Sequence, residues 1–249
     1  MKIRYGFLIL VFIGAIVFIY YNRPIEKNYQ VMGTTVRIKI NDWFSGNSAD
    51  QAFQEIKRLD KLFSRFDKES DVGRLKERNF VPSADTIKCL ELADKVKKLS
   101  GGAFDVSSNQ TAWDIDLGGI GKGYAVEAAR QLLLKRGVKS AIIDMHSSMA
   151  VIGDGWRIGI KGGNDVVVLN DGDALATSGQ YEQPGHIIDP RNGKPADKCQ
   201  GVTVIAKDAG LADALSTAIF VLGPEEGRRL ADKLQVGVII YENSSTQLR

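Results

Sequence analysis

The sequence predicts an α+β fold: one domain that follows a short apolar segment. The chain has 249 residues, of which 44% are hydrophobic and 25% are charged, and these fractions are ordinary for a globular protein. Strand-like runs are concentrated between residues 140 and 177, and helical patterns lie before and after them. Strands grouped in this way favour an α+β fold, with central, mostly antiparallel strands flanked by helices, over a regular doubly wound fold.

The first 24 residues predict a membrane anchor. Tyr5–Tyr21 is an uncharged apolar run of 17 residues, close to the lower limit of about 17 for a helix that crosses a bilayer. Lys2 and Arg4 precede the run, which predicts a cytoplasmic N-terminus and an extracytoplasmic domain over 25–249. Because the run ends without the small residues of a cleavage site, we expect an uncleaved single-pass anchor, with a cleaved signal peptide as the alternative.

The net charge excludes one class of partner. The formal charge of +3 arises from basic residues at positions 2, 4 and 23, where no acidic residue offsets them. The rest of the chain is therefore neutral. A neutral domain lacks the basic face with which proteins grip phosphate backbones, so we expect no nucleic-acid partner.

The first half of the domain predicts one strand and three helices. Residues 23–28 have the composition of a short polar linker, and alternating apolar side chains over 36–40 predict a half-buried strand. Periodic apolar residues, Ser83 as an N-cap and glycines at helix ends define the helices. They are expected from near Ser48 to 63, from Ser83 to about 100, and over 121–136.

The second half of the domain predicts most of the strands. They are expected over 140–143, 149–152, 156–160, 166–169, 174–177, 202–206 and 236–241, with helices over 211–222 and 224–234. Cys89 and Cys199 match no zinc or redox motif. A disulfide between them stays open, and buried free thiols are the simpler expectation.

The glycine-rich stretch from Asp116 to Tyr124 carries the first functional signal. It lacks the glycine and the Ser or Thr of a P-loop, and Tyr124 stands where a dinucleotide-binding motif needs its third glycine. What remains is a glycine loop that leads into a helix N-terminus, with backbone amides and Lys122 available to an anion. The alternative is a tight turn that uses glycine only for its backbone angles.

A second signal is the spacing of Asp213 and Thr217. These residues lie four apart in an expected helix, so that a carboxylate and a hydroxyl face the same way. Such oxygen ligands suit a hard cation such as Mg²⁺ that bridges phosphates. The alternative is that Asp213 lies in the first helical turn and only complements the helix dipole.

The two histidines are the remaining candidates. His186 lies in a loop with Asp189 and Arg191 and could move protons at a phosphate centre; the alternative is a turn in which Asp189 bonds its own backbone. His146 adjoins Ser147, but neighbours in sequence rarely form a catalytic pair and the chain has no G-x-S-x-G elbow. We therefore discount a hydrolase site at His146.

These segments, in this order, resemble the ApbE family of FAD:protein FMN transferases over nearly all of residues 29–241. The matching segments are Met32–Thr35, Phe63–Ser70, Gly102–Asp105, Asp116–Tyr124, Thr177–Gly179, His186–Gly193 and Ala212–Thr217. The resemblance implies Mg²⁺-dependent transfer of FMN from FAD to a Ser or Thr hydroxyl of an acceptor redox protein, with release of AMP.

The resemblance also implies a role for each matching residue. It places FAD against Met32, Phe66, Ala103, Phe104, Asp105, Asp116, Lys122 and Ile188. Phe66 would pack on the adenine. Mg²⁺ would be held by the Gly119 carbonyl, Asp213 and Thr217, and His186 would be the general base.

The chain departs from the family pattern at several places. Only Val106–Ile115 separates two motifs that usually lie several dozen residues apart, and His146–Ser148 replaces a Gly-Gly pair. Asn192 stands in place of a threonine, and Lys76 in place of an asparagine. Two alternatives therefore stay open: an FAD pyrophosphatase that gives FMN and AMP, and a non-catalytic FAD-binding or assembly protein.

Overall fold

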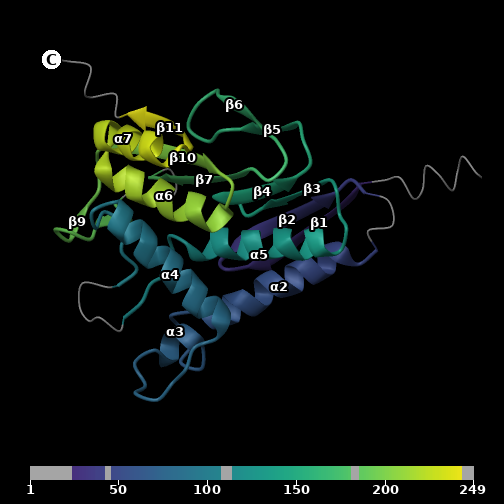
Figure 1. The fold of residues 1–249 in the computed structure, drawn as a ribbon, viewed down its shortest axis with the longest axis horizontal. Helices are drawn as coiled ribbons and strands as arrows, with labels where there is room; N and C mark the ends of the chain where they lie inside the picture. The colour runs from purple at the N-terminus through teal and green to yellow at the C-terminus, as the bar shows by residue number, and fades with distance from the viewer. Residues whose placement is uncertain (1–23, 43–45, 108–113, 181–184, 243–249) are drawn as a thin grey trace, which may run out of the picture.

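An antiparallel sheet organises the part of the chain that the computed structural model describes, residues 24–42, 46–107, 114–180 and 185–242 (Figure 1). Within these ranges the sheet has seven strands in the order β1-β2-β3-β4-β7-β10-β11. The strands are β1 (Ile25–Val31), β2 (Thr34–Ile40), β3 (Ala141–Asp144), β4 (Ser148–Ile152), β7 (Ala174–Gly179), β10 (Cys199–Ala206) and β11 (Gly237–Glu242). Every neighbouring pair is antiparallel, as predicted.

Helices cover one face of this sheet. The helices are α2 (Ser48–Phe63), α3 (Asp71–Arg74), α4 (Ala84–Leu99), α5 (Gly121–Lys135), α6 (Ala209–Leu222) and α7 (Pro224–Leu234). Of these, α3 packs on α2, and α4 packs on α6 and α2. In Figure 1, α2 lies along β1 and β2, and α5 and α6 cross the middle of the sheet. The predicted α+β arrangement is therefore confirmed, and the expected helices begin and end within two residues of the observed ones.

The central strands are buried on both faces. Alternate residues of β3, such as Ile143, face the helices and join the main hydrophobic core. The intervening residues, such as Ile142 of β3 and Val151 of β4, form a second apolar cluster on the opposite face. A hairpin of β5 (Trp156–Gly159) and β6 (Val166–Leu169) covers this second cluster. This is why β4 is buried along its whole length.

The predicted polar linker over 23–28 is wrong, because β1 begins at Ile25 and pairs with β2 along its full length. Its polar side chains are used in packing. Lys27 forms an ion pair with Asp50 of α2 at 2.6 Å, and the Tyr29 hydroxyl donates to the same carboxylate at 2.7 Å. The Tyr29 ring stacks on Phe53. An edge strand stabilised by a neighbouring helix in this way has no strong apolar alternation.

Other short elements were also not predicted: α3, and the two-stranded pair of β8 (Ile188–Asp189) and β9 (Lys194–Pro195).

The predicted anchor lies in residues that are not described; the described ranges contain no helix that is both long and apolar enough to span a bilayer. Cys89 and Cys199 are free, buried thiols, and burial raises the pKa of Cys199 to about 11.

Arg130 is a buried charge that joins α5 to two loops. Its side chain is 4% exposed and forms an ion pair with Glu127 at 2.6 Å. Its guanidinium also donates to the carbonyl oxygens of Gly172 and Lys207, at 2.7 and 2.6 Å. These bonds tie Arg130 to the loop before β7 and to the residue after β10.

We expect Arg130→Met to lower the free energy of unfolding by about 3 kcal/mol or more, because Glu127 and the carbonyl groups lose a buried partner. Chemical denaturation followed by circular dichroism measures this. Arg229→Met is the matched control, since its ion pair with Glu225 is 75% and 81% exposed and should change stability by less than about 0.5 kcal/mol. Equal effects of the two substitutions would contradict a structural role for Arg130.

Candidate active site

The predicted site residues gather around one cavity of about 770 Å³. Its walls come from the β1–β2 turn, the loop before α5, the β3–β4 turn, the end of β7, the segment before β8 and the first turns of α6. It is lined by Met32, Ala103, Phe104, Asp105, Asp116, Gly119, Lys122, His186, Ile188, Asp213 and Thr217. Eleven of the twelve predicted residues thus share one cavity.

Phe66 is the predicted residue that does not line the cavity. Its side chain is 85% exposed, and the Arg65 guanidinium lies 4.9 Å from the centre of its ring. Arg65 itself lines the cavity and forms an ion pair with Asp116 at 2.7 Å. Phe66 therefore lies next to a residue of the cavity wall, and its proposed packing on adenine stays a prediction.

A tight turn brings Met32 to the cavity. Val31 of β1 pairs with Thr34 of β2, which leaves Met32 and Gly33 as a two-residue turn. Both have positive φ angles, 51° and 68°, as a type I′ hairpin turn requires. The Met-Gly-Thr segment therefore has a structural role, because its Met-Gly pair forms the turn that places Met32 at the wall of the cavity.

The glycine-rich stretch packs the start of α5 against α6. Gly123 donates its N–H to Asp213 Oδ2 at 2.8 Å. A Cβ atom at Gly123 would lie 2.5 Å from the Asp213 Cβ, and closer still to the Ala209 carbonyl oxygen. Only glycine allows this approach. The alternative in which Asp213 lies in the first turn of its own helix and only complements the helix dipole is therefore wrong. Asp213 lies beyond the first turn of α6, is 4% exposed, and bonds the N-terminus of a different helix, α5.

The Asp213 carboxylate is poised to hold a cation. Burial raises the pKa of Asp213 above its ordinary range, although Lys122 and the Gly123 amide act in the opposite direction. A buried carboxylate with so little opposing charge is stabilised by a cation beside it. Lys122 lies in the first turn of α5 and also lines the cavity.

The atoms around Asp213 supply the oxygen ligands that suit Mg²⁺. The Thr217 hydroxyl lies one helical turn away, 3.0 Å from the Ser178 hydroxyl. Gly119 lies against Thr217, since a Cβ there would be 3.3 Å from the Thr217 Oγ1. Within the described residues no group of three or more His, Cys, Asp or Glu side chains surrounds a metal position. The set fits Mg²⁺ held by one carboxylate, with phosphate oxygens completing its coordination.

Another hydroxyl group lies unsatisfied nearby. The side-chain oxygen of Ser147, in the β3–β4 turn, is buried and has no hydrogen-bond partner among the described residues. Ser147 lines the cavity. Buried hydroxyl groups usually have partners, so this wall of the cavity is suited to a polar ligand.

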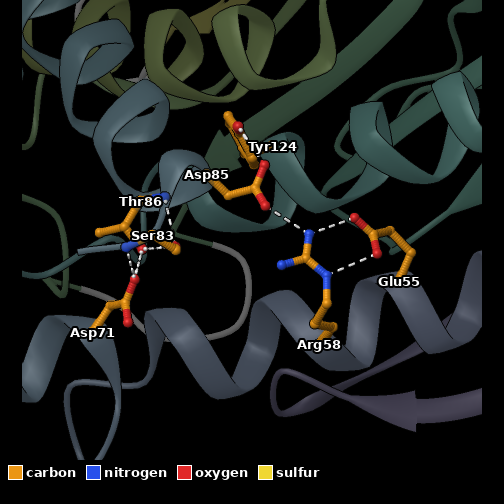
Figure 2. A network of polar contacts seen from close by, with 7 residues as sticks. All are labelled: Glu55, Arg58, Asp71, Ser83, Asp85, Thr86 and Tyr124. Atoms are coloured by element: carbon orange, nitrogen blue, oxygen red, sulfur yellow. Dashed lines mark hydrogen bonds and ion pairs between the residues drawn. The ribbon is translucent and has the colours of Figure 1, made fainter. Parts of the chain in front are cut away.

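A polar network holds α5 in place behind the cavity (Figure 2). The Tyr124 hydroxyl of α5 donates to Asp85 at the start of α4, at 3.3 Å. Asp85 also accepts from Arg58 of α2 at 2.6 Å, and Arg58 bonds both carboxylate oxygens of Glu55. Three helices are thereby tied together close to Gly123 and Lys122.

Asp105 is another acidic residue of the wall, and local bonds hold its carboxylate. The Asp105 carboxylate accepts from Lys97 at 2.6 Å and from the Ser107 backbone and hydroxyl. Burial acts to raise the pKa of Asp105, but these bonds outweigh it and hold that pKa below its ordinary value. Asp105 is therefore ionised at neutral pH and able to accept hydrogen bonds from a ligand.

His186 lies exposed at the cavity wall. The Asp189 carboxylate accepts from the Arg191 guanidinium at 2.8 and 2.9 Å and from the Asn192 side chain, and it also accepts from the Arg191 backbone N–H. The turn in which Asp189 bonds its own neighbours is thus confirmed. Bonding by Arg191 holds the pKa of Asp189 below its ordinary value, although burial opposes it.

Sequence reasoning missed several residues of the wall, among them Arg65, His146, Lys161 and Ser178. Arg65 and Ser178 lie inside matching segments, and this could have drawn attention to them. His146 was noticed only for a hydrolase site. Lys161, in the loop between β5 and β6, has no local signal, because only the folded hairpin brings it to the cavity.

Comparison with known proteins decides the family. A model described as the ApbE family matches residues 32–113 and 106–240. The chain belongs to the ApbE family. The order of matching segments is therefore a family pattern, and the cavity lies where the family's segments converge.

Two curated relatives are both described as FAD:protein FMN transferase. The one from Rhodobacter capsulatus is 32% identical over 170 residues, which cover 61% of this chain and 32% of the relative. The one from Klebsiella pneumoniae is 36% identical over 133 residues, 47% of this chain and 42% of the relative. The chain thus spans less than half the length of the curated relatives that it matches.

Solved ApbE structures share the fold over most of this chain. The ApbE protein from Thermotoga maritima has a TM-score of 0.77 at 26% identity and covers 91% of this chain and 99% of its own. A mutant of the flavin transferase ApbE from Vibrio cholerae has a TM-score of 0.78 at 23% identity, covering 89% and 94%.

Proposed function

We propose that this protein transfers FMN from FAD to a Ser or Thr hydroxyl of an acceptor redox protein and releases AMP, with Mg²⁺ as its cofactor. The single observation that supports this most is the meeting of Asp213, Thr217, Gly119 and Lys122 in one cavity. It combines oxygen ligands for a hard cation with an ammonium group at a helix N-terminus. Family membership and the names of the relatives point to the same reaction.

The proposed chemistry needs charge stabilisation more than covalent help. The acceptor hydroxyl oxygen attacks the phosphorus of the FMN phosphate, and the bond from that phosphorus to the bridging oxygen breaks, so that AMP leaves with the bridging oxygen. When bound, Mg²⁺ would neutralise charge on the pyrophosphate. The Lys122 ammonium would add to this.

The remaining residues would bind and orient. His186 would take the proton that the attacking hydroxyl loses, because a hydroxyl is a weak nucleophile at neutral pH. Met32, Ala103, Phe104 and Ile188 offer apolar surface to the planar rings of FAD, and Asp105 and Asp116 offer carboxylate oxygens to its hydrogen donors. Phe66 would have to move towards the cavity to stack on adenine.

The test is to incubate the full chain with FAD, Mg²⁺ and a redox-protein domain that carries a Ser or Thr flavinylation site. We expect AMP release together with flavin fluorescence that stays on the acceptor in a denaturing gel, and neither when Mg²⁺ is chelated. The control acceptor has the Ser or Thr replaced by Ala. FMN and AMP without a labelled acceptor would instead show a pyrophosphatase, and FAD binding without turnover would show a binding protein.

We also propose that the domain is held on the extracytoplasmic side of the cytoplasmic membrane. The support is the apolar run Tyr5–Tyr21 with its preceding basic residues. We expect the full chain to sediment with membranes. We also expect protease to digest the domain when it is added to spheroplasts but not when it is added to intact cells. Full recovery in the cytosolic fraction would contradict this.

A further inference from the structure

His146 is a cavity residue whose backbone is held in an unusual conformation. Its φ is 63°, in the left-handed region that residues other than glycine seldom adopt. Its backbone N–H donates to Asp144 Oδ1 at 2.9 Å, and Asp144 Oδ2 accepts from Arg37 of β2 at 2.9 Å. The turn between β3 and β4 is thus fixed from the neighbouring strand. A strained position that is held so firmly at a cavity wall points to a function.

The imidazole ring of His146 is oriented as well. Its Nδ1 lies 3.2 Å from the carbonyl oxygen of Thr35. A carbonyl oxygen can only accept a hydrogen bond, so Nδ1 carries the hydrogen. In the neutral ring Nε2 is then an acceptor, and it has no hydrogen-bond partner among the residues that the structure describes. The fold therefore presents one acceptor nitrogen of known tautomer at the wall of the cavity.

Building on the function proposed above, we propose that His146 orients the bound flavin nucleotide by accepting, at Nε2, a hydrogen bond from an N–H or O–H group of that ligand. FAD carries donors of both kinds: the imide N–H of the flavin ring, and the hydroxyl groups of its ribityl chain and ribose. His146 is thereby distinct from His186, which would act on the acceptor hydroxyl.

The test measures the Kd of FAD by quenching of flavin fluorescence at pH 8, for the wild type, His146→Gly and His146→Gln. Glycine accepts the positive φ without strain, so this variant should fold with a melting temperature at or above that of the wild type. We expect the ratio of the His146→Gly Kd to the wild-type Kd to be about 5- to 10-fold. His146→Gln keeps a hydrogen-bond acceptor, so its loss of affinity should be smaller.

An FAD analogue methylated at the flavin imide nitrogen identifies the donor. If the ratio at pH 8 falls to one with this analogue, the imide N–H is the donor; if the ratio persists, a hydroxyl group is. A ratio that stays within twofold of one at pH 8 overturns the role of His146. A wild-type protein that does not bind FAD at all would instead overturn the proposed function, and the two failures are thus distinguishable.

Discussion

Asp213→Asn is expected to abolish Mg²⁺-dependent turnover and at the same time to raise the melting temperature of the metal-free protein. Activity is lost because the amide removes the one buried carboxylate of the proposed metal position. Stability rises because a buried charge with little compensation is removed, while the asparagine oxygen still accepts from Gly123. A gain of about 1 kcal/mol would raise the melting temperature by roughly 2–4 °C.

The pH dependence of this gain follows from the raised pKa of Asp213. A carboxyl group that ionises later in the folded than in the unfolded protein makes the fold less stable as pH rises, from its ordinary pKa up to the raised one. The stability difference between Asp213→Asn and the wild type should therefore be smallest below about pH 4 and constant above the raised pKa. Thermal melts in chelator across this range measure it.

Added Mg²⁺ supplies the control. It should raise the melting temperature of the wild type and leave Asp213→Asn unchanged, because only the wild type has the carboxylate. The effect should weaken at low pH, where a proton competes with the cation. A mutant that still turns over FAD with Mg²⁺, or that melts below the wild type in chelator, would contradict the assignment of Asp213.

Gly123→Ala is expected to damage both the fold and the site. The new methyl group would meet the Ala209 carbonyl and lie 2.5 Å from the Asp213 Cβ, so that α5 and α6 must separate and Asp213 must move. Overpacking of this kind costs about 1–3 kcal/mol. We also expect at least a tenfold loss of turnover, since the Gly123 N–H would no longer orient the carboxylate.

Gly121→Ala is the matched control, two residues earlier in the same helix. A Cβ atom there would meet its nearest neighbours, Leu117 and Phe63, at 3.6 Å, which is an ordinary contact. This variant should keep wild-type turnover and gain up to about 1 kcal/mol through the lower entropy of its unfolded state. Denaturant melts and AMP release measure both variants, and the proposed tight packing fails if Gly123→Ala behaves like Gly121→Ala.

The elements that could be predicted from sequence are those whose signal is local. The 48–63 helix has apolar residues at helical spacing, and the helix after Ser83 has an N-cap that does accept from the Thr86 N–H. β1 could not be predicted in the same way, because Lys27 and Tyr29 are held in the strand by pairing with β2 and by contacts with Asp50 of α2. Their stabilisation is tertiary, and no window of sequence contains it.

In the candidate site too, features that depend on nearby residues could be predicted from sequence, and features that depend on distant residues could not. The spacing of Asp213 and Thr217 predicts that both face one way, and the structure places both at the cavity. That the Asp213 carboxylate bonds Gly123 could not be predicted, since the two lie 90 residues apart. The positive φ of His146 is equally hidden, because it depends on Asp144 and on the neighbouring strand β2.

The β5–β6 hairpin limits which substitutions this protein can accept during evolution. Its loop carries Ile160 into the second apolar cluster and the next residue, Lys161, into the cavity wall. Two adjacent residues of this segment therefore have different roles: Ile160 packs on the face of the sheet opposite the helices, and Lys161 forms part of the cavity wall. Substitutions in the second cluster, far from any ligand atom, are expected to alter ligand affinity, and natural variation there should be narrower than packing alone requires.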